Sequence, residues 1–361
     1  MDDWLQFWVT NKHEINRLWT SPELYSKNKI EKVSKSTGEL YSKETREFEG
    51  ITFKKEPHYP KEPNESKERI VIGFKPHYWY NGDKHNANDF NAIQCIKTMQ
   101  KFIDLFEIKE SNFYPVNNIE YGLNFLFNNY GKEFIGYNIY HSRNEFIQDQ
   151  EHKYAKRAHS YTKGKPNYYL YAKLYSKGFQ FPEYCNSNTL RFELGSRERK
   201  YIKKLGIETI EDLLNIKTYY KLKNALINNA NNILILEQHP ILLNLNKRDK
   251  NRLITKYTNS ASWFDSLQNT RSAAFNEKKA RYFELLDRTG YNINYEFQKS
   301  IREKLDILLP EKRKDSTPLT KPHKRKDSTL DKGRILTVSN NKIYPVTGVD
   351  ISMQKKGSKL S

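Results

Sequence analysis

The stretch YYLYAKLYSK, residues 168–177, constrains the fold more than any other part of this chain. Read with a period of two, it puts Tyr169, Tyr171, Lys173, Tyr175 and Lys177 on one face and Leu170, Ala172 and Leu174 on the other. Strict alternation of this kind is typical of a half-buried β-strand with one face against a core. The stretch therefore predicts a strand whose outward face carries phenols and ammonium groups.

Two more segments alternate in the same way. In residues 117–127, the apolar residues Ile119, Tyr121, Leu123 and Phe125 alternate with Glu120, Gly122 and Asn124. In residues 189–197, Leu190, Phe192 and Leu194 face inward, whereas Arg191, Glu193 and Arg197 face outward. The short connection between the segments at 168–177 and 189–197 predicts that they are antiparallel neighbours. If the Glu120 strand joins the same sheet, the outward side chains form one surface.

We call this surface the polar face. It consists of Glu120, Tyr171, Lys173, Tyr175, Lys177, Arg191 and Glu193.

The rest of the chain divides by pattern. Residues 1–67 indicate short strands and turns, with a hairpin turn at Thr37-Gly38, and RIVIGF at 69–74 indicates a buried strand followed by a loop. A helical pattern begins at Phe90, with Asn88 or Asp89 as its N-cap. Residues 133–141 resemble another strand.

From residue 206 to 309 the pattern is helical, including the run at 219–236, and Thr209 with Asp212 resembles a capping box. These patterns predict an α+β protein. An N-terminal segment (1–29) is followed by an antiparallel-sheet catalytic domain (30–205), a helical domain (206–309) and a basic tail (310–361). The tail repeats KRKDST and carries thirteen Lys or Arg against five Asp or Glu, so we expect a partly disordered segment that contacts phosphates.

The composition favours a polyanionic partner. The 361 residues carry a formal charge of +19, which favours nucleic acid before an acidic membrane. The alternative is a soluble protein that is merely rich in lysine. The most apolar run, NILILEQHPILLNL, is interrupted by polar residues and cannot span a bilayer. Two cysteines, Cys95 and Cys185, indicate neither a zinc site nor a disulfide framework, so we expect a reducing, cytoplasmic location.

The residue types of the polar face suit phosphoryl chemistry. A tyrosine hydroxyl, with a pKa of about 10, is a poor nucleophile until lysines or a divalent cation stabilise the phenolate. Glu120 and Glu193 could hold a hard cation such as Mg²⁺ or Mn²⁺, and Arg191 could orient a phosphate. The alternatives are a solvated sheet edge, an ion pair of Arg191 with Glu193, and a solvent-facing Glu120.

Other nucleic-acid chemistries lack their motifs. The nine histidines never occur as His-x-His, the chain has no Gly-rich phosphate loop, and no His-x-x-Arg element precedes a late tyrosine as in tyrosine recombinases.

Several stretches together resemble a known family. They are Asp3-Trp4, TGE at 37–39, YNGDKHNANDF at 80–90, NNIEYGLNF at 117–125, LYSKG at 174–178, the run at 190–213 and VTGVDISMQKKGS at 346–358. In these stretches the chain resembles the replication initiation proteins of small phages and rolling-circle plasmids. The resemblance is to a branch related to the filamentous-phage gene II/X group and the plasmid trans-acting Rep group.

The resemblance implies a site-specific DNA nicking-closing enzyme that initiates rolling-circle replication in the cytoplasm of a bacterial host. Its partners would be single- and double-stranded origin DNA and a host helicase and polymerase. The family nucleophile maps to Tyr175 with Lys177, where YSK replaces the usual YDK or YNK, and Tyr171 with Lys173 repeats the spacing, so either tyrosine could attack. The metal ligands map to Glu193 and Glu120. The alternative is a non-enzymatic origin- or operator-binding protein.

Overall fold

The computed structural model describes residues 1–25, 30–33, 40–111, 114–127, 130–150, 152–269 and 272–309. Met1–Lys312 form one compact unit. The predicted turn at Thr37-Gly38 and the tail from residue 310 lie outside the described residues. The domain boundaries predicted at 30, 206 and 310 stay predictions.

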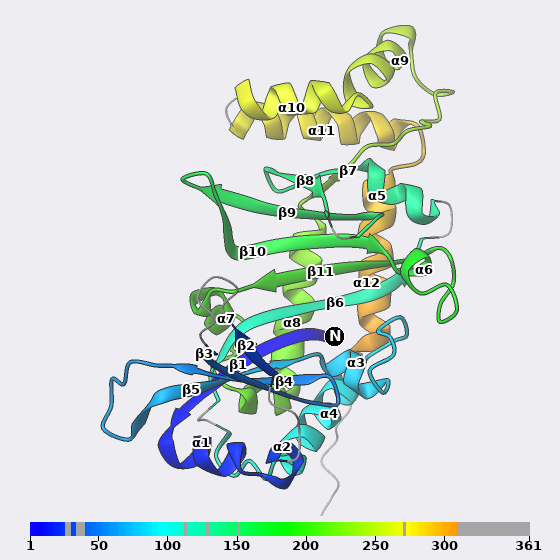
Figure 1. Ribbon diagram of the computed structural model, residues 1–361. Helices are drawn as coiled ribbons and strands as arrows, with labels where there is room; N and C mark the ends of the chain where they lie inside the picture. The colour runs from blue at the N-terminus through cyan, green and yellow to red at the C-terminus, as the bar shows by residue number, and fades with distance from the viewer. Residues whose placement is uncertain are drawn as a thin grey trace, which may run out of the picture. The chain divides into compact units, whose positions relative to one another are not determined.

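A twelve-stranded sheet organises this unit, in the order β12-β7-β8-β9-β10-β11-β6-β1-β5-β4-β3-β2 (Figure 1). Its strands are β1 (Asp2–Asn11), β2 (Ile30–Val33), β3 (Leu40–Phe48), β4 (Ile51–Pro57), β5 (Glu65–Phe74), β6 (Val116–Leu126), β7 (Asn138–His141), β8 (Asn144–Gln148), β9 (Ala155–Thr162), β10 (Lys165–Ser176), β11 (Thr189–Ser196) and β12 (Ile233–Ile235). Each neighbouring pair is antiparallel. The predicted α+β class is confirmed.

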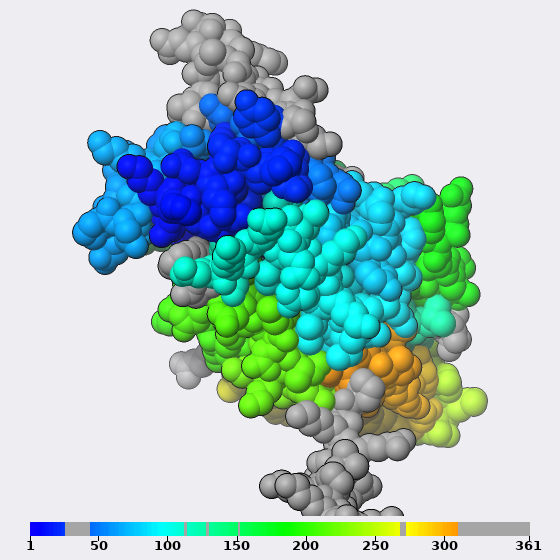
Figure 2. Space-filling view, turned by 90° about the horizontal axis from the view of Figure 1, so that it is seen from below, coloured from blue at the N-terminus to red at the C-terminus, as the bar shows by residue number. Residues whose placement is uncertain are grey.

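The helices complete the unit. They are α1 (Lys12–Trp19), α2 (Pro22–Tyr25), α3 (Pro76–Tyr80), α4 (Ala92–Leu105), α5 (Phe134–Tyr137), α6 (Lys177–Gln180), α7 (Arg199–Lys204), α8 (Ile216–Ala230), α9 (Lys247–Arg252), α10 (Ser260–Asn269), α11 (Ser272–Arg288) and α12 (Ile293–Leu308), with short turns η2 (Gly131–Glu133), η3 (Ile210–Leu214) and η4 (Leu253–Tyr257). α8 contacts both α4 and α12, and α12 packs on β6. Seen from below, the surface of α4 lies between that of the N-terminal segment and those of α8 and α12 (Figure 2).

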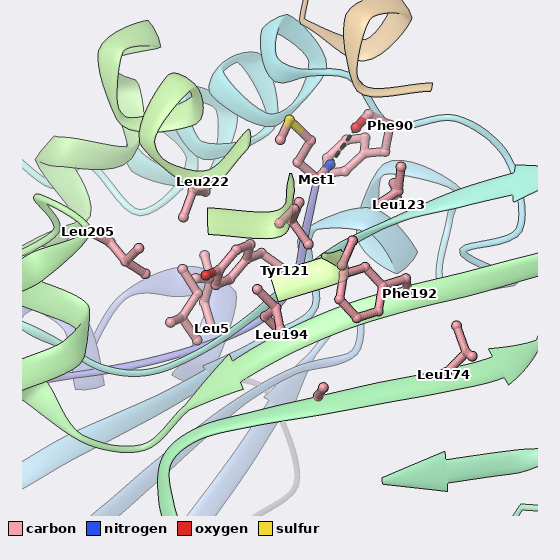
Figure 3. Packing of buried hydrophobic residues seen from close by; sticks show 14 of the residues in the cluster. Met1, Leu5, Phe90, Tyr121, Leu123, Leu174, Phe192, Leu194, Leu205 and Leu222 are labelled. Carbon is pink, nitrogen blue, oxygen red and sulfur yellow. Dashed lines mark hydrogen bonds between the residues drawn. The ribbon is translucent and has the colours of Figure 1, made fainter. Parts of the chain in front are cut away.

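The core lies between the central strands and these helices (Figure 3). Phe192 and Leu194 of β11 are fully buried on this side, and Phe192 meets Phe297 of α12 with ring centroids 6.1 Å apart. Tyr121 of β6 is also buried, and its hydroxyl meets that of Tyr201 at 3.3 Å. Each such buried side chain stabilises the fold by about 1.5–3 kcal/mol. The apolar faces predicted for β6 and β11 are confirmed.

One residue of the opening stretch lies on the other side from its predicted place. Tyr169 packs against Tyr201, with ring centroids 5.2 Å apart, and so contacts the core rather than the polar face. The register between β9 and β10 shifts between Asn167 and Tyr171, and a bulge of this kind breaks the alternation of side chains.

Several predictions of local structure are wrong at the N-terminal side. Residues 12–19 form helix α1 rather than strands and turns, because Asn11 caps the amide of Glu14 and the apolar residues recur at helical spacing. Residues 76–80, predicted as loop, form α3. Helix α4 begins at Ala92, where Asn91 and Gln94 make a reciprocal capping box, and not at Phe90.

Further along the chain, two elements change type. Residues 134–137 form α5, so only the second half of the predicted strand exists, as β7. Helix α8 ends at Ala230, and Ile233–Ile235 pair with β7 as β12, which β-branched residues favour. The capping box of Thr209 and Asp212 is confirmed, at the start of the 3₁₀ turn η3. No helix in the described part of the chain is long and apolar enough to cross a membrane.

Candidate active site

Strand pairing brings the polar face together as one surface. β10 pairs with β11 so that Lys173 lies opposite Glu193 and Tyr175 opposite Arg191. β11 in turn pairs with β6, which places Glu120 opposite Gly195. The predicted neighbours are therefore confirmed, and the Glu120 strand belongs to the same sheet.

Two glycines make room for large side chains on this surface. A Cβ at Gly195 would lie 2.3 Å from the Tyr171 ring, so the ring can cross β11 only because that position has no side chain. A Cβ at Gly122 would lie 2.7 Å from Cγ of Glu193. The glycines thus allow Tyr171 to reach Glu120 and Glu193 to lie flat on β6.

β1 adds a third carboxylate that the sequence prediction missed. β1 pairs with β6, with an irregularity between Asp2 and Trp4, and the carboxylate of Asp3 lies beside those of Glu120 and Glu193. Each of the three residues offers an oxygen atom, and these oxygens all lie within 4.8 Å of one another. The Asp3-Trp4 pair was one of the stretches carrying the family resemblance, and this resemblance was the only sequence feature that pointed to Asp3.

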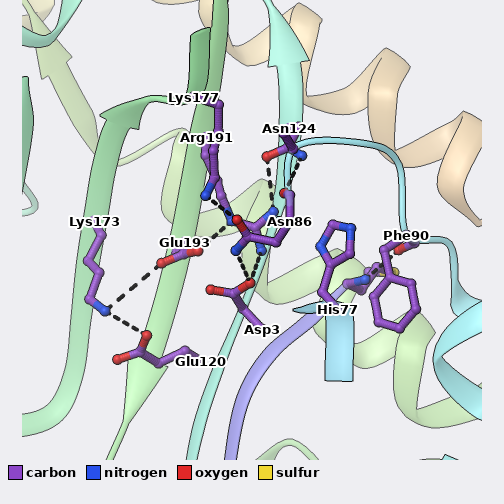
Figure 4. Close-up of polar contacts among 12 residues, drawn as sticks. Asp3, His77, Asn86, Phe90, Glu120, Asn124, Lys173, Lys177, Arg191 and Glu193 are labelled. Atoms are coloured by element: carbon purple, nitrogen blue, oxygen red, sulfur yellow. Dashed lines mark hydrogen bonds and ion pairs between the residues drawn. The ribbon is translucent and has the colours of Figure 1, made fainter. Parts of the chain in front are cut away.

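The guanidinium of Arg191 balances this negative charge and lies between Asp3 and Glu193 (Figure 4). The residue is 1% exposed. Its guanidinium forms an ion pair with Asp3 at 2.9 Å and another with Glu193, and it donates a hydrogen bond to Oδ1 of Asn124 at 3.0 Å. The ion pair between Arg191 and Glu193, one of the alternatives from the sequence, is therefore present. With these contacts, Arg191 supports the carboxylates and does not face the solvent.

The surroundings shift the pKa values of Asp3 and Glu193 in opposite directions. Burial alone would raise the pKa of Asp3, but the charges of Arg191 and Lys177 outweigh it and hold that pKa below its ordinary value. Burial and the negative charge of Asp3 raise the pKa of Glu193 to about 7. Glu193 therefore changes charge near neutral pH.

The two tyrosines each bond to a different carboxylate. The hydroxyl of Tyr175 donates to Oε1 of Glu193 at 2.6 Å, and that of Tyr171 donates to Oε1 of Glu120 at 2.6 Å. Tyr171 is only 1% exposed, whereas Tyr175 is half-buried and lines the cavity described below. In both residues burial, followed by the charge of the neighbouring carboxylate, raises the pKa above its ordinary value.

The two lysines differ in their surroundings. Lys173 donates to Oε2 of Glu120 at 2.6 Å and lies 4.0 Å from Oε2 of Glu193 (Figure 4). Lys177, the first residue of α6, is 1% exposed and its Nζ lies 4.8 Å from the centre of the Tyr175 ring. Burial and the charge of Arg191 lower the pKa of Lys177 to about 7.

A loop after α3 holds the edge of the cluster in place. Asn86 donates to Oδ1 of Asp3 at 2.6 Å and accepts a hydrogen bond from Lys177. The backbone carbonyl of Asn86 accepts from Asn124 at 3.0 Å, and Asn124 also bonds Arg191. The sequence prediction did not single out Asn86, although the stretch at 80–90 was part of the family resemblance.

An open cavity of about 630 Å³ lies over the polar face. Asp3, Glu120, Tyr175 and Glu193 all contribute to its lining. Six further lining residues are cationic, namely Lys75, Lys156, Arg157, Lys173, Lys177 and Arg197. The cavity therefore combines an acidic cluster with many positive groups, which suits an anionic ligand that shares a cation with the carboxylates.

The acidic cluster fits a hard divalent cation. Three carboxylate oxygens within 4.8 Å of one another are close enough to share one such ion. The donors are all oxygen, which disfavours soft metals.

Comparisons with known proteins give one structural similarity. No protein-family model matches the chain, and no curated protein matches its sequence. The chain is similar to a solved structure described as a rolling circle replication initiator protein from Geobacillus stearothermophilus, with a TM-score of 0.33 and 10% sequence identity. The match covers 75% of this chain and 97% of that chain. At this TM-score and identity the similarity supports no conclusion about this chain, so the chemistry below rests on the site itself.

Proposed function

We propose that this protein is a metal-dependent DNA nicking-closing enzyme that initiates rolling-circle replication of a small phage or plasmid. One observation carries the proposal. A half-buried phenol, that of Tyr175, is hydrogen-bonded to one of three clustered carboxylates inside a cavity lined by cationic side chains. Origin DNA is the substrate, and a host helicase and polymerase would act on the nicked product.

In the proposed reaction, the Tyr175 oxygen attacks the phosphorus of one phosphodiester. The bond from phosphorus to the 3′ oxygen breaks, and the 5′ phosphate stays on the tyrosine. The phenol proton passes to Oε1 of Glu193, which already accepts its hydrogen bond at 2.6 Å, and Glu193 then gives this proton to the departing 3′ oxygen. The reverse sequence rejoins the strand.

The other residues have supporting roles. Asp3, Glu120 and Glu193 would hold Mg²⁺ or Mn²⁺, which when bound stabilises the charge on the phosphate and favours the phenolate. Lys173 and Lys177 flank Tyr175 and provide positive charge for the phosphate. Arg191 keeps Asp3 and Glu193 together beneath the cavity.

Tyr175 is a better candidate for the nucleophile than Tyr171. Tyr175 lines the cavity, whereas Tyr171 is 1% exposed, lies across Gly195 and is not part of the lining. A phosphate in the cavity would therefore meet Tyr175 first.

The test is covalent adduct formation on supercoiled DNA that carries the origin of the encoding replicon. Wild-type protein and Tyr171→Phe should form a DNA adduct with Mg²⁺ or Mn²⁺ and none with chelator. Tyr175→Phe keeps the packing ring and should bind DNA without forming the adduct. An adduct that persists in Tyr175→Phe and disappears in Tyr171→Phe would move the nucleophile by four residues; one that persists in the double variant would refute the mechanism.

A second candidate function is origin or operator binding without catalysis. It is favoured by the raised pKa values of Tyr171 and Tyr175, because a phenol that holds its proton tightly is suited to a structural hydrogen bond. A protein of this kind would bind the origin with the same affinity in chelator and in Mn²⁺, and would never form the adduct.

A further inference from the structure

Strand β1 carries aromatic side chains along the same side of the sheet as the acidic cluster. Leu5, Phe7 and Val9 are fully buried in the core. Because side chains alternate along a strand, Trp4 and Trp8 point to the opposite side. Both are half-buried, whereas the other three tryptophans, Trp19, Trp79 and Trp263, are at most 9% exposed.

Trp4 lies directly beside the cluster. It pairs in register with Glu120 and lines the cavity. Its ring rests on the backbone of β5, since a Cβ at Gly73 would lie only 2.7 Å from Cη2 of Trp4. Gly73 therefore allows the indole to lie on the sheet as a platform at the edge of the cavity.

Trp8 lies four residues further along β1, about 13 Å from Trp4 at the usual rise of a strand. Two guanidinium groups lie near its ring: that of Arg69 on β5 at 5.0 Å and that of Arg199 on α7 at 5.8 Å. Arg69 also pairs with Glu56 at 2.6 Å. Strand β1 thus leads from the carboxylates to a second aromatic ring that has two guanidinium groups beside it.

We propose that this row, Trp4 and Trp8 with Arg69 and Arg199, is a binding track for single-stranded nucleic acid. Bases stack on the two indoles, and the phosphates meet the guanidinium groups. The inference deepens the proposed function, because the track begins beside Tyr175 and Glu120 in the same cavity. In this proposal, the single-stranded nucleic acid leaves the cavity along β1.

The chemistry of the track favours a nucleic acid over other ligands. Two aromatic rings, the second with two guanidinium groups beside it, match a polyanion whose bases have exposed faces, and the chain carries a formal charge of +19. The opposite side of the cavity offers a second arrangement. There Arg197 lies 4.4 Å from the ring of Tyr168, next to β9. Binding along Tyr168 instead of β1 is therefore an outcome that the test must separate.

The experiment measures binding of the full chain to fluorescent single-stranded oligonucleotides in chelator, by anisotropy. Trp8→Ala should weaken binding to oligo(dT) about 5- to 100-fold, and Trp8→Phe should retain most of it. An abasic strand of equal length has the same charge and no bases, so it should bind wild type and Trp8→Ala equally. Tyr25→Ala removes an aromatic ring that is 74% exposed on α2 and should change nothing.

Wild-type fluorescence gives a measurement that needs no variant. Because the other three tryptophans are buried, base-containing strands should quench the emission of Trp4 and Trp8, and abasic strands should not. Unchanged binding by Trp8→Ala, an equal loss on abasic strands, or a loss confined to Tyr168→Ala would overturn the track.

The adduct assay keeps the two proposals distinguishable. A protein that shows base-dependent loss in Trp8→Ala but forms no adduct retains the track and loses the nicking function. If the wild-type protein forms the adduct but Trp8→Ala binds single strands as tightly as wild type, the nicking function stands and the track is refuted.

Discussion

The two faces of β6, β10 and β11 both bury side chains, but one face buries apolar groups and the other buries charged groups. On the core face, Phe192 and Leu194 are fully buried among apolar side chains. On the polar face, Arg191 and Glu193 are each 1% exposed, although they alternate with those same two residues. Equal burial therefore coexists with opposite chemistry along one strand.

The difference shows where each face gets its stability. The core face is stabilised by apolar area removed from water. The polar face is stabilised by mutual compensation, in which Arg191 neutralises Asp3 and Glu193 while Lys173 bonds Glu120. Removing one charge there leaves its partner buried and unpaired. Where the removed charge is positive, a bound cation can take its place.

The largest expected effect follows from removing the central charge. Arg191→Met should destabilise the metal-free protein by about 3–5 kcal/mol, because it leaves two buried carboxylates without their counter-ion. Mn²⁺ should restore part of this loss. Leu194→Ala on the core face should cost about 2–5 kcal/mol with no recovery in Mn²⁺. Urea unfolding with and without the ion measures both, and equal responses to Mn²⁺ would remove the distinction between the faces.

A smaller effect is expected at the loop that covers the polar face. Asn86→Ala removes the hydrogen bonds to Asp3 and from Lys177 and should destabilise the protein by about 1–3 kcal/mol. It should also weaken Mn²⁺ binding, because Asp3 loses its orientation. Calorimetric titration with Mn²⁺ checks this, with Asn81→Ala in the same loop as the control. Unaltered Mn²⁺ affinity in Asn86→Ala would limit Asn86 to a structural role.

The ammonium of Lys173 should compete with the cation. Lys173→Met removes a positive charge that bonds Glu120, so it should tighten Mn²⁺ binding about tenfold, or about 1.4 kcal/mol. Lys156, another lysine of the cavity, bonds the backbone oxygens of Gly136 and Asn138 instead. Lys156→Met should change the affinity much less. Weaker Mn²⁺ binding by Lys173→Met would show that this lysine helps to assemble the cluster.

The smallest expected effect is on pH dependence. The pKa of Glu193 is raised to about 7 from an ordinary value of 4.5, so the folded protein binds more protons than the unfolded chain between these values. The contribution of Glu193 to stability therefore falls as the pH rises through this window. Cation binding needs the ionised form, so Mn²⁺ affinity should drop about threefold from pH 7.5 to pH 6.5.

Thermal shifts with Mn²⁺ at several pH values measure this dependence. The pKa of Lys177 is lowered to about 7, so this lysine becomes positively charged as the pH falls from 7.5 to 6.5 and would also repel the ion. Lys177→Met separates the two contributions, since a threefold drop that remains in this variant belongs to the carboxylate. A flat profile in wild-type protein would contradict the assignment to Glu193.

The sequence by itself determined the two faces of the central strands. The side-chain period of a strand is two, so Phe192 and Leu194 had to lie opposite Arg191 and Glu193 in any sheet that buries one face. The same pattern paired Tyr175 with Lys173 on one surface. The alternation failed at Tyr169, where a bulge between β9 and β10 depends on the partner strand.

Only the tertiary structure decided what completes the site. Asp3 comes from β1 and Asn86 from the loop after α3, and no local pattern links either of them to Glu193. The sequence also predicted that Arg191 faces outward, but its guanidinium bonds Asp3, Glu193 and Asn124, and the residue is buried. Periodicity depends on neighbouring residues in the chain, whereas burial and charge compensation depend on groups that meet after folding across more than eighty residues.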